Sequence, residues 1–221
     1  MPRSRFMVTL FAALVVALAA PLVTVQPTTL QAAEVAPSRD LRVAVVGDSL
    51  SAGRSGFLGN GLDDESWMSY AQGDGIVFAG GWARAGATPD EMAAAVRPVG
   101  HVDVLVILAG TNAVRLGRSL HDERQAYERI VETIGASEVV VADIPPYRWK
   151  PEEARTYSRE LRMFVASRGW RWVDPWGWAR SGSGWADGVS SDGTHPADAD
   201  EYERLGAAFR AIILGNTSSS A

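Results

Sequence analysis

Two short segments of the chain carry side chains that could together perform nucleophilic catalysis. Ser49 lies in a GDSL segment directly after an apolar run, where a tight turn into a helix would expose its hydroxyl. Asp192 comes three residues before His195 in a polar loop, and at this spacing a carboxylate can orient an imidazole toward a nucleophile. Each segment also has an ordinary interpretation, because Ser often caps a helix and Asp often stands in turns.

The other histidines and the lack of cysteine narrow the chemistry. His101 precedes an apolar run and His121 begins a charged helical pattern, so we interpret both as surface residues. Asp187 lies in the same loop as His195 and is the alternative acid to Asp192. The chain contains no cysteine, which excludes a thiol nucleophile, a Cys-ligated zinc ion and a disulfide framework.

Two further segments could supply hydrogen-bond donors to a developing negative charge. Asn112 ends a GTN segment after the third apolar run, and its uncharged amide could donate to an oxyanion. Gly86 follows the second run. Since a glycine lets the backbone approach a ligand closely, its N–H could be a second donor. Taken alone, an Asn in a turn and a Gly in a loop are ordinary.

The elements that must position these residues follow from the apolar pattern. Near-continuous apolar runs predict strands at 41–46, 76–79, 102–109, 138–142 and 170–173. Apolar residues at helical spacing predict helices after Thr88, around 127–134, over 154–165 and from about 199 to 214. This alternation indicates an α/β fold, a three-layer α/β/α sandwich around a mainly parallel five-stranded sheet. Because ligands bind at the carboxyl ends of such strands, we expect the four segments to meet there.

Together the four segments resemble the block pattern of the SGNH (GDSL-type) hydrolase family. The resemblance runs from about residue 41 to residue 214 and rests on GDSL, WARAGAT, GTN and DGTH, which occur in the family's order. It implies the flavodoxin-like SGNH fold with Ser49 as nucleophile and with Asp192 and His195 as the other catalytic residues. It also implies an oxyanion hole made by Ser49, Gly86 and Asn112.

The sequence departs from the family pattern at two places. Ala113 stands where an acidic residue often follows GTN, and the Gly-Gly-Trp stretch at 80–82 replaces an Asn that usually precedes Gly86. We expect these departures to affect loop support or substrate contacts more than the core mechanism. The tryptophans near the predicted site could contact substrate or pack beneath a long loop. Substrate contacts are predicted at Asp48, Trp82, Pro146 and Trp185.

The resemblance implies a serine esterase that hydrolyses carboxylic esters of short acyl or acetyl groups through an acyl-enzyme, without a metal or cofactor. An O-acyltransferase acting on envelope glycans would use the same residues, with a sugar hydroxyl in place of water. A non-catalytic glycan-binding domain is a further alternative, suggested by the eight tryptophans. We expect a monomer whose partners are small-molecule, glycan or lipid esters. The net charge of −5 and pI near 5.3 argue against a nucleic-acid partner.

The first residues have the pattern of an export signal. Arg3 and Arg5 precede an uncharged run over 6–25, and small residues follow, which is typical of a secretory signal peptide. We assign residues 1–33 to this peptide, with cleavage after Ala19 or near 32–33, or to an uncleaved membrane anchor. We predict a linker at 34–40, the hydrolase domain at 41–215 and a frayed tail at 216–221. The domain is then expected to be secreted or attached to the cell envelope, and at a membrane only if the segment stays uncleaved.

Overall fold

A parallel five-stranded sheet forms the centre of the domain, and the computed structural model describes residues 39–215 around it. The strand order is β2-β1-β3-β4-β5, and every pairing is parallel. All five residues of β3 are buried, as expected for a strand covered on both faces. The strands are β1 (Leu41–Gly47), β2 (Ile76–Ala83), β3 (Val104–Leu108), β4 (Glu138–Ala142) and β5 (Arg171–Val173).

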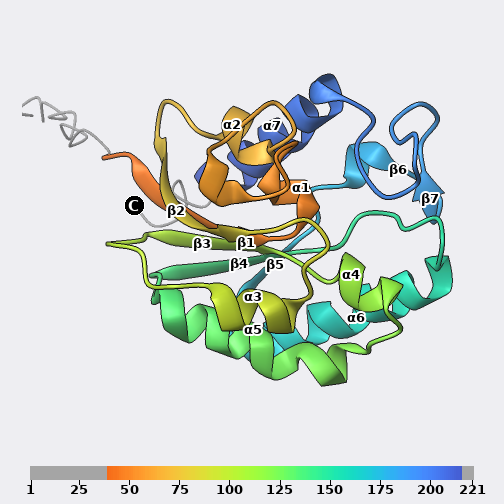
Figure 1. The fold of residues 1–221 in the computed structure, drawn as a ribbon, viewed down its shortest axis with the longest axis horizontal. Helices are drawn as coiled ribbons and strands as arrows, with labels where there is room; N and C mark the ends of the chain where they lie inside the picture. The colour runs from red at the N-terminus through yellow and green to blue at the C-terminus, as the bar shows by residue number, and fades with distance from the viewer. Residues whose placement is uncertain (1–38, 216–221) are drawn as a thin grey trace, which may run out of the picture. The chain divides into compact units, whose positions relative to one another are not determined.

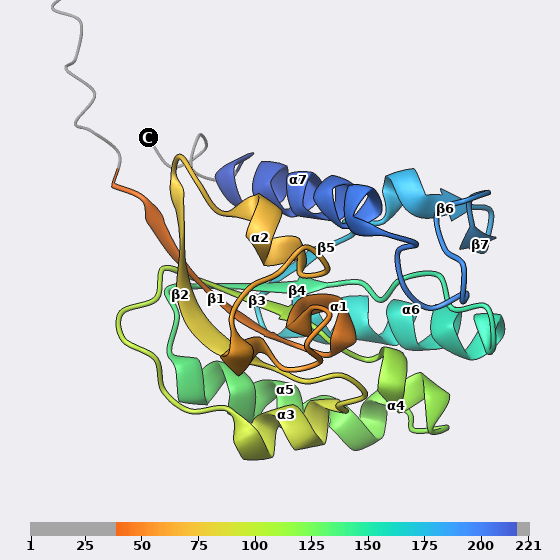
Figure 2. The same cartoon turned by 45° about the horizontal axis from the view of Figure 1, so that its top comes forward.

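Helices cover both faces of this sheet and confirm the predicted three-layer sandwich (Figure 1; Figure 2). One face carries α1 (Ser49–Ala52), α2 (Trp67–Ala71) and α7 (Ala199–Gly215). The other face carries α3 (Pro89–Ala95), α4 (Thr111–Arg115), α5 (Leu120–Ile134) and α6 (Pro151–Ser167). Short 3-10 turns at Leu58–Asn60 and Gly177–Ala179 and a small hairpin of β6 (Arg180–Ser181) and β7 (Gly184–Trp185) complete the elements.

Each face of the sheet has its own apolar core. Between α2 and α7 the rings of Trp67 and Phe209 stack with centroids 4.0 Å apart. On the opposite face Tyr127 of α5 and Leu161 of α6 are fully buried against the strands. Their helical spacing along the sequence predicted these buried stripes. The layers therefore hold the carboxyl edge of the sheet, from which α1 and α4 begin, on a rigid base (Figure 1).

The second strand is longer than the sequence suggested. Glycines at 80 and 81 favour a loop when taken locally, but β2 continues to Ala83. A bulge keeps it paired with β1, because Val43 faces Phe78 while the next residue, Ala44, faces Gly80. A Cβ at Gly81 would lie 1.9 Å from the carbonyl oxygen of Val45. The glycine thus permits a close approach of two backbones, which is a reason for Gly within a strand.

The predicted start of the helix after Thr88 is confirmed. Pro89 is the first residue of α3. The Thr88 hydroxyl accepts a hydrogen bond from the Glu91 N–H at 3.4 Å, and the Glu91 carboxylate accepts one from the Thr88 N–H at 2.9 Å. This reciprocal capping box satisfies two donors that a helix start otherwise leaves unpaired.

The predicted export signal, most of the linker and the tail at 216–221 lie outside the described residues. Arg39 and Asp40, predicted as the end of the linker, contact the domain. Arg39 pairs with Asp103 at 2.5 Å, and the Asp40 carboxylate accepts a hydrogen bond from the N–H of Gly75 at 3.1 Å. Within residues 39–215 no helix has the length and apolar character needed to cross a membrane.

Candidate active site

Ser49, His195 and Asp192 form a continuous hydrogen-bonded chain at the carboxyl edge of the sheet. Ser49 opens α1 directly after β1, and His195 lies in the loop that leads to α7. Ser49 Oγ lies 2.7 Å from His195 Nε2, and His195 Nδ1 lies 2.7 Å from Asp192 Oδ2. The alternative acid Asp187 is exposed and has no hydrogen bond or ion pair with His195 in the part of the chain that the structure describes. The fold therefore brings together the three residues predicted as nucleophile, base and orienting acid.

The loop backbone holds Asp192 in place. Its Oδ1 accepts hydrogen bonds from the N–H groups of Thr194 and His195, each at 2.8 Å. The loop turns at Gly193 with φ +76°, where a Cβ would lie 2.5 Å from Arg148 Cβ, so the turn requires glycine. Partial burial acts to raise the pKa of Asp192, but the hydrogen bonds from His195 and the two N–H groups outweigh it and lower the pKa below its ordinary value. Asp192 is therefore a carboxylate at neutral pH, as an acid that orients a histidine should be.

The backbone N–H groups of Ser49 and Gly86 are available as donors. Neither has a hydrogen-bond partner within residues 39–215, whereas the N–H groups of Leu50, Ala85 and Ala87 each have one. Ser49 and Gly86 line one common cavity. Two unpaired N–H groups in one cavity with a serine hydroxyl are the donors that an oxyanion hole would need.

The side-chain amide of Asn112 is fixed at both ends. Asn112 belongs to α4, a short helix that the sequence pattern did not predict. Its Nδ2 donates to Asp48 Oδ2 at 3.3 Å and to the carbonyl oxygen of Ala87 at 3.2 Å, while its Oδ1 accepts from Arg115 Nε at 3.1 Å. Both amide hydrogens thus have protein acceptors at long distances. Donation to an oxyanion requires Asn112 to share or exchange one of these bonds.

Asp48 is a buried carboxyl group next to Ser49. It is 1% exposed. Its Oδ1 accepts from the Leu50 N–H at 3.1 Å, and its Oδ2 accepts from Asn112. Burial raises the pKa of Asp48 to about 6, although the Leu50 N–H, the charge of His195 and the Asn112 amide act to lower it. The sequence predicted a substrate contact, but both oxygens already serve protein donors, so in this structure Asp48 supports the turn of Ser49 and the amide of Asn112.

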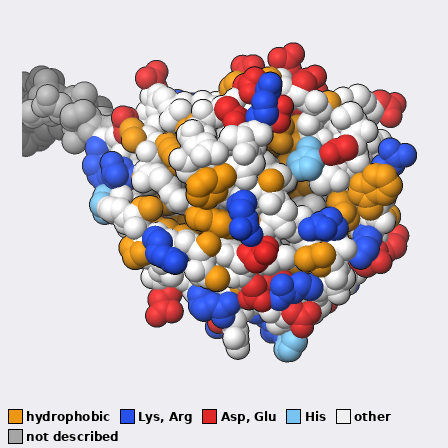
Figure 3. Space-filling view, in the orientation of Figure 1, with side chains coloured by type: hydrophobic (Ala, Val, Ile, Leu, Met, Phe, Trp, Pro, Cys, Tyr) orange, Lys and Arg blue, Asp and Glu red, His pale blue; other side chains and the backbone are white. Residues whose placement is uncertain are grey.

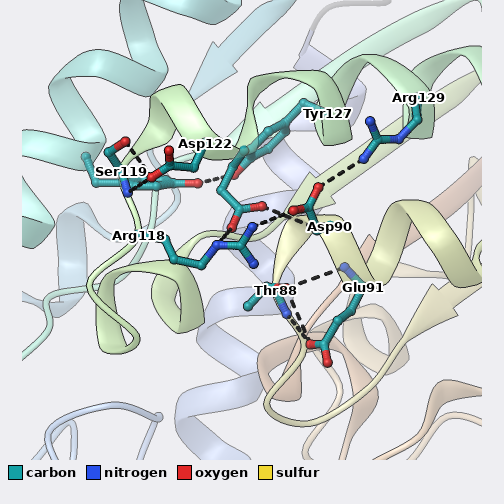
Figure 4. A network of polar contacts seen from close by, with 10 residues as sticks. Thr88, Asp90, Glu91, Arg118, Ser119, Asp122, Tyr127 and Arg129 are labelled. Carbon is teal, nitrogen blue, oxygen red and sulfur yellow. Dashed lines mark hydrogen bonds and ion pairs between the residues drawn. The ribbon is translucent and has the colours of Figure 1, made fainter.

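A network of charged side chains ties the start of α3 to α5 (Figure 4). Arg118 contacts Asp90 of α3, and its Nε lies 2.8 Å from Glu123 of α5, whose side chain is fully buried. The Glu123 carboxylate also accepts from the Asp90 N–H at 3.1 Å, and Arg129 pairs with Asp90 at 3.0 Å. Burial raises the pKa of Glu123 while the charge of Arg118 opposes the rise. The network therefore joins the segment after Gly86 to the segment after α4.

The cavity at this edge has a volume of about 330 Å³. Three of its lining residues lie outside the four motifs from which the sequence predicted the site: Arg115, Tyr147 and Trp149. The available signal for Trp149 was a lone tryptophan between two basic residues in the loop after the fourth strand. The lining comprises Asp48, Ser49, Leu50, Ala85, Gly86, Thr111, Asn112, Arg115, Tyr147, Trp149, Thr194 and His195.

Three predicted substrate contacts do not line this cavity. Trp82 packs edge-on against Phe57 with ring centroids 6.4 Å apart, and Trp185 packs edge-on against Trp176 at 5.8 Å. Pro146 is buried and borders a neighbouring hollow. Packing was the alternative interpretation of the tryptophans, and it is the arrangement that Trp82 and Trp185 adopt.

The charges on the surface are mixed in sign. Figure 3 shows basic and acidic side chains interspersed over the face drawn. Some are paired across elements, as Arg129 is with Asp90 and Arg168 with Glu128. Within residues 39–215 no three His, Asp or Glu side chains gather in a group that could hold a metal ion.

These features define the class of the protein as a three-layer α/β/α domain with a Ser-His-Asp constellation at the carboxyl edge of a parallel sheet. Residues 45–199 match the model of the GDSL-like Lipase/Acylhydrolase family. The chain belongs to this family, and it is a carboxylic ester hydrolase. No curated protein matches the chain.

Solved structures share the fold at low sequence identity. A lipolytic protein of the G-D-S-L family from Desulfitobacterium hafniense matches with a TM-score of 0.60 and 14% identity over 78% of this chain and 99% of its own. A carbohydrate acetylesterase family member from Sinorhizobium meliloti matches with a TM-score of 0.56 and 18% identity over 78% of this chain and 97% of its own. A carbohydrate esterase family 3 protein from Talaromyces cellulolyticus matches with a TM-score of 0.56 and 14% identity over 82% of this chain and 100% of its own. These matches extend over nearly the whole length of each relative and agree with the predicted fold.

Proposed function

We propose that Ser49, His195 and Asp192 hydrolyse esters of short acyl groups, acetyl first among them, through a covalent acyl-enzyme. The observation that carries the proposal is the 2.7 Å distance from Ser49 Oγ to His195 Nε2, continued by the 2.7 Å distance from Nδ1 to Asp192. Because Asp192 accepts a hydrogen bond from Nδ1–H, Nε2 is left with its lone pair facing the serine hydroxyl. A neutral His195 in this tautomer is the base that the reaction needs.

In the first half of the reaction, Ser49 Oγ forms a bond to the ester carbonyl carbon while its proton moves to His195 Nε2. The carbonyl oxygen becomes an oxyanion, for which the N–H groups of Ser49 and Gly86 are available and the Asn112 amide is a third donor. Asp192 stabilises the imidazolium that forms. Collapse of the intermediate breaks the bond to the alcohol oxygen, which takes the proton from His195.

In the second half, water attacks the acyl-enzyme and gives its proton to His195 Nε2. The second tetrahedral intermediate uses the same donors, and its collapse releases the acid and returns the proton to Ser49 Oγ. Each half needs one base and one oxyanion site, so the same residues serve both.

The preference for short acyl groups is supported by the cavity. Its volume of about 330 Å³ is at the small end of the range of ~300–1,000 Å³ for ligand sites. Two of the similar structures are described as a carbohydrate acetylesterase family member and a carbohydrate esterase, which also favours a small acyl group.

We also propose that the domain acts outside the cytoplasm. The pattern of residues 1–33, with Arg3 and Arg5 before an uncharged run, supports this location. Expression of the full chain followed by cell fractionation and N-terminal mass spectrometry tests it. Activity confined to the cytoplasm, with the N-terminal segment intact, contradicts the proposal.

The catalytic proposal is tested by labelling and by a series of substrates. A fluorophosphonate should modify Ser49 alone, as read by peptide mass spectrometry, and Ser49→Ala should abolish both labelling and hydrolysis. Among p-nitrophenyl esters, kcat/KM should be highest for acetate and fall as the acyl chain lengthens. Labelling at another serine, or full activity of Ser49→Ala, rules out the mechanism, and a maximum at long chains rules out the acyl preference.

A further inference from the structure

One large aromatic side chain at the candidate active site is left open to solvent. Trp149 is 64% exposed and lines the cavity that contains Ser49. The other exposed large hydrophobic side chains of the described residues lie outside that lining: Phe57, Val77, Leu116 and Met163. An exposed indole costs hydration free energy, and its place at the mouth of the cavity makes contact with a ligand the straightforward compensation.

The backbone that carries Trp149 is anchored on both sides of the cavity. The N–H of Arg148 donates to the carbonyl oxygen of Gly193 at 3.0 Å, in the loop that carries the catalytic histidine. Lys150 Nζ donates to the carbonyl oxygens of Val114 and Arg115 at 3.2 and 3.0 Å, at the end of α4. The Arg148 guanidinium also lies 5.7 Å from the Trp149 ring centroid, within the range of a cation–π contact. The indole is therefore presented by a fixed segment, which lowers the entropy cost of using it in binding.

The position of Trp149 relates it to the alcohol half of the ester. His195 gives its proton to the leaving alcohol oxygen, so the alcohol lies beside this histidine. The segment of Trp149 is hydrogen-bonded to the same loop through Gly193, and both side chains line one cavity. A group attached to the leaving oxygen lies in the same cavity as the indole and can contact it.

The groups around the indole combine an apolar face with hydrogen-bond donors. Arg115 lines the cavity and is exposed. Its Nε is used by Asn112, while its terminal nitrogens have no hydrogen-bond partner among residues 39–215. The Thr194 hydroxyl also belongs to the lining. An alkyl alcohol can use only the apolar face of the indole, whereas a sugar ring has an apolar C–H face for the indole and hydroxyls that can accept from the guanidinium.

We propose that Trp149 and Arg115 form a subsite for a sugar ring, so that the scissile ester joins a short acyl group to a carbohydrate hydroxyl. This inference rests on the proposed function and adds to it the class of the alcohol. The sugar stacks on the indole, and its hydroxyls accept hydrogen bonds from the Arg115 guanidinium. Trp149 acts here as a specificity residue, since it contacts the substrate away from the reacting atoms.

The test compares acetylated xylo-oligosaccharides with ethyl acetate and ethyl octanoate as substrates of the wild type, Trp149→Ala, Trp149→Phe and Met163→Ala. Trp149→Ala should lower kcat/KM on the oligosaccharide by about tenfold more than on ethyl acetate, mainly through KM, because stacking is lost. Trp149→Phe keeps an aromatic face and should recover part of this loss. Met163→Ala removes a side chain of similar exposure, 60%, on α6. It should leave kcat/KM unchanged on all three substrates.

Equal losses on the oligosaccharide and on ethyl acetate would overturn the inference, and so would a larger loss on ethyl octanoate, which indicates an acyl contact. Titration of Ser49→Ala with the same oligosaccharide by calorimetry measures the subsite without turnover. Binding that weakens about tenfold on adding Trp149→Ala supports the subsite even if hydrolysis fails. Hydrolysis of ethyl acetate with no contribution of Trp149 to oligosaccharide binding leaves the proposed function standing and removes the sugar subsite.

Discussion

The Asn112→Ala variant separates an oxyanion donor from a residue that only supports the fold. In the structure Asn112 is placed for both roles. Its Nδ2 donates hydrogen bonds to Asp48 and to the Ala87 carbonyl oxygen at 3.3 and 3.2 Å, and the residue lines the cavity. Removal leaves two buried acceptors without this donor, which costs about 1–3 kcal/mol of unfolding free energy. The loss is measurable by urea unfolding.

The catalytic loss has a different size and a different signature. Removing one oxyanion donor typically lowers kcat by about 10²–10³, or roughly 3–4 kcal/mol. Because Asn112 must give up or share a protein bond to reach the oxyanion, we expect the lower part of this range, about 10²-fold. The neutral substrate carbonyl gains little from the donor, so KM should change far less than kcat.

The assay is steady-state hydrolysis of p-nitrophenyl acetate at a temperature where the variant is fully folded. Ile130→Ala is the control, because Ile130 is fully buried on α5 outside the cavity lining and its truncation costs about 2–5 kcal/mol without removing a donor. This control should keep a kcat near that of the wild type. A loss of tenfold or less in folded Asn112→Ala, or an equal loss in Ile130→Ala, refutes the role of Asn112 as an oxyanion donor.

Three other perturbations test the electrostatics of the site. Asp192→Asn should lower kcat by about 10⁴ while Asp187→Asn stays close to wild type, and the opposite result would reassign the acid. Arg118→Met should destabilise the fold by about 3 kcal/mol in urea, because it leaves the buried Glu123 carboxylate without compensation. Glu123→Gln should cost less, since Arg118 is one-third exposed and can hydrate; the reverse order contradicts this account. Burial raises the pKa of Asp48 from 3.8 to about 6, so ionisation opposes folding and stability falls as pH rises through this interval. The unfolding free energy of Asp48→Asn relative to wild type should therefore rise by roughly 2–3 kcal/mol between pH 4 and 7, from about two pKa units at 1.36 kcal/mol each. A difference that is constant with pH would show that Asp48 is not the titrating group.

The sequence alone was sufficient for the features that depend on neighbouring residues. The apolar run of β4 has the predicted bounds, and α3 begins directly after Thr88 as predicted, because side-chain burial and helix starts are set within one or two turns. The same holds for the order of the four motifs, which identified the candidate residues. Their placement after strands of one parallel sheet was enough to predict that Ser49 and His195, 146 residues apart, would meet.

What the tertiary structure decided depends on partners that lie far apart in the chain. The sequence predicts either a turn residue or a hydrogen-bond donor at Asn112. Only the tertiary contacts with Asp48, 64 residues away, and with Ala87 show that its amide hydrogens already have acceptors. The local sequence at 80–81 favours a loop. In the structure this stretch is part of β2, because glycine at 81 fits against the backbone of Val45. The local sequence at Trp149 shows only a tryptophan between two basic residues, and its position at the cavity follows from hydrogen bonds of its neighbours to Gly193 and α4. A local pattern cannot encode such contacts, because each depends on how two separate segments are brought together by the packed core.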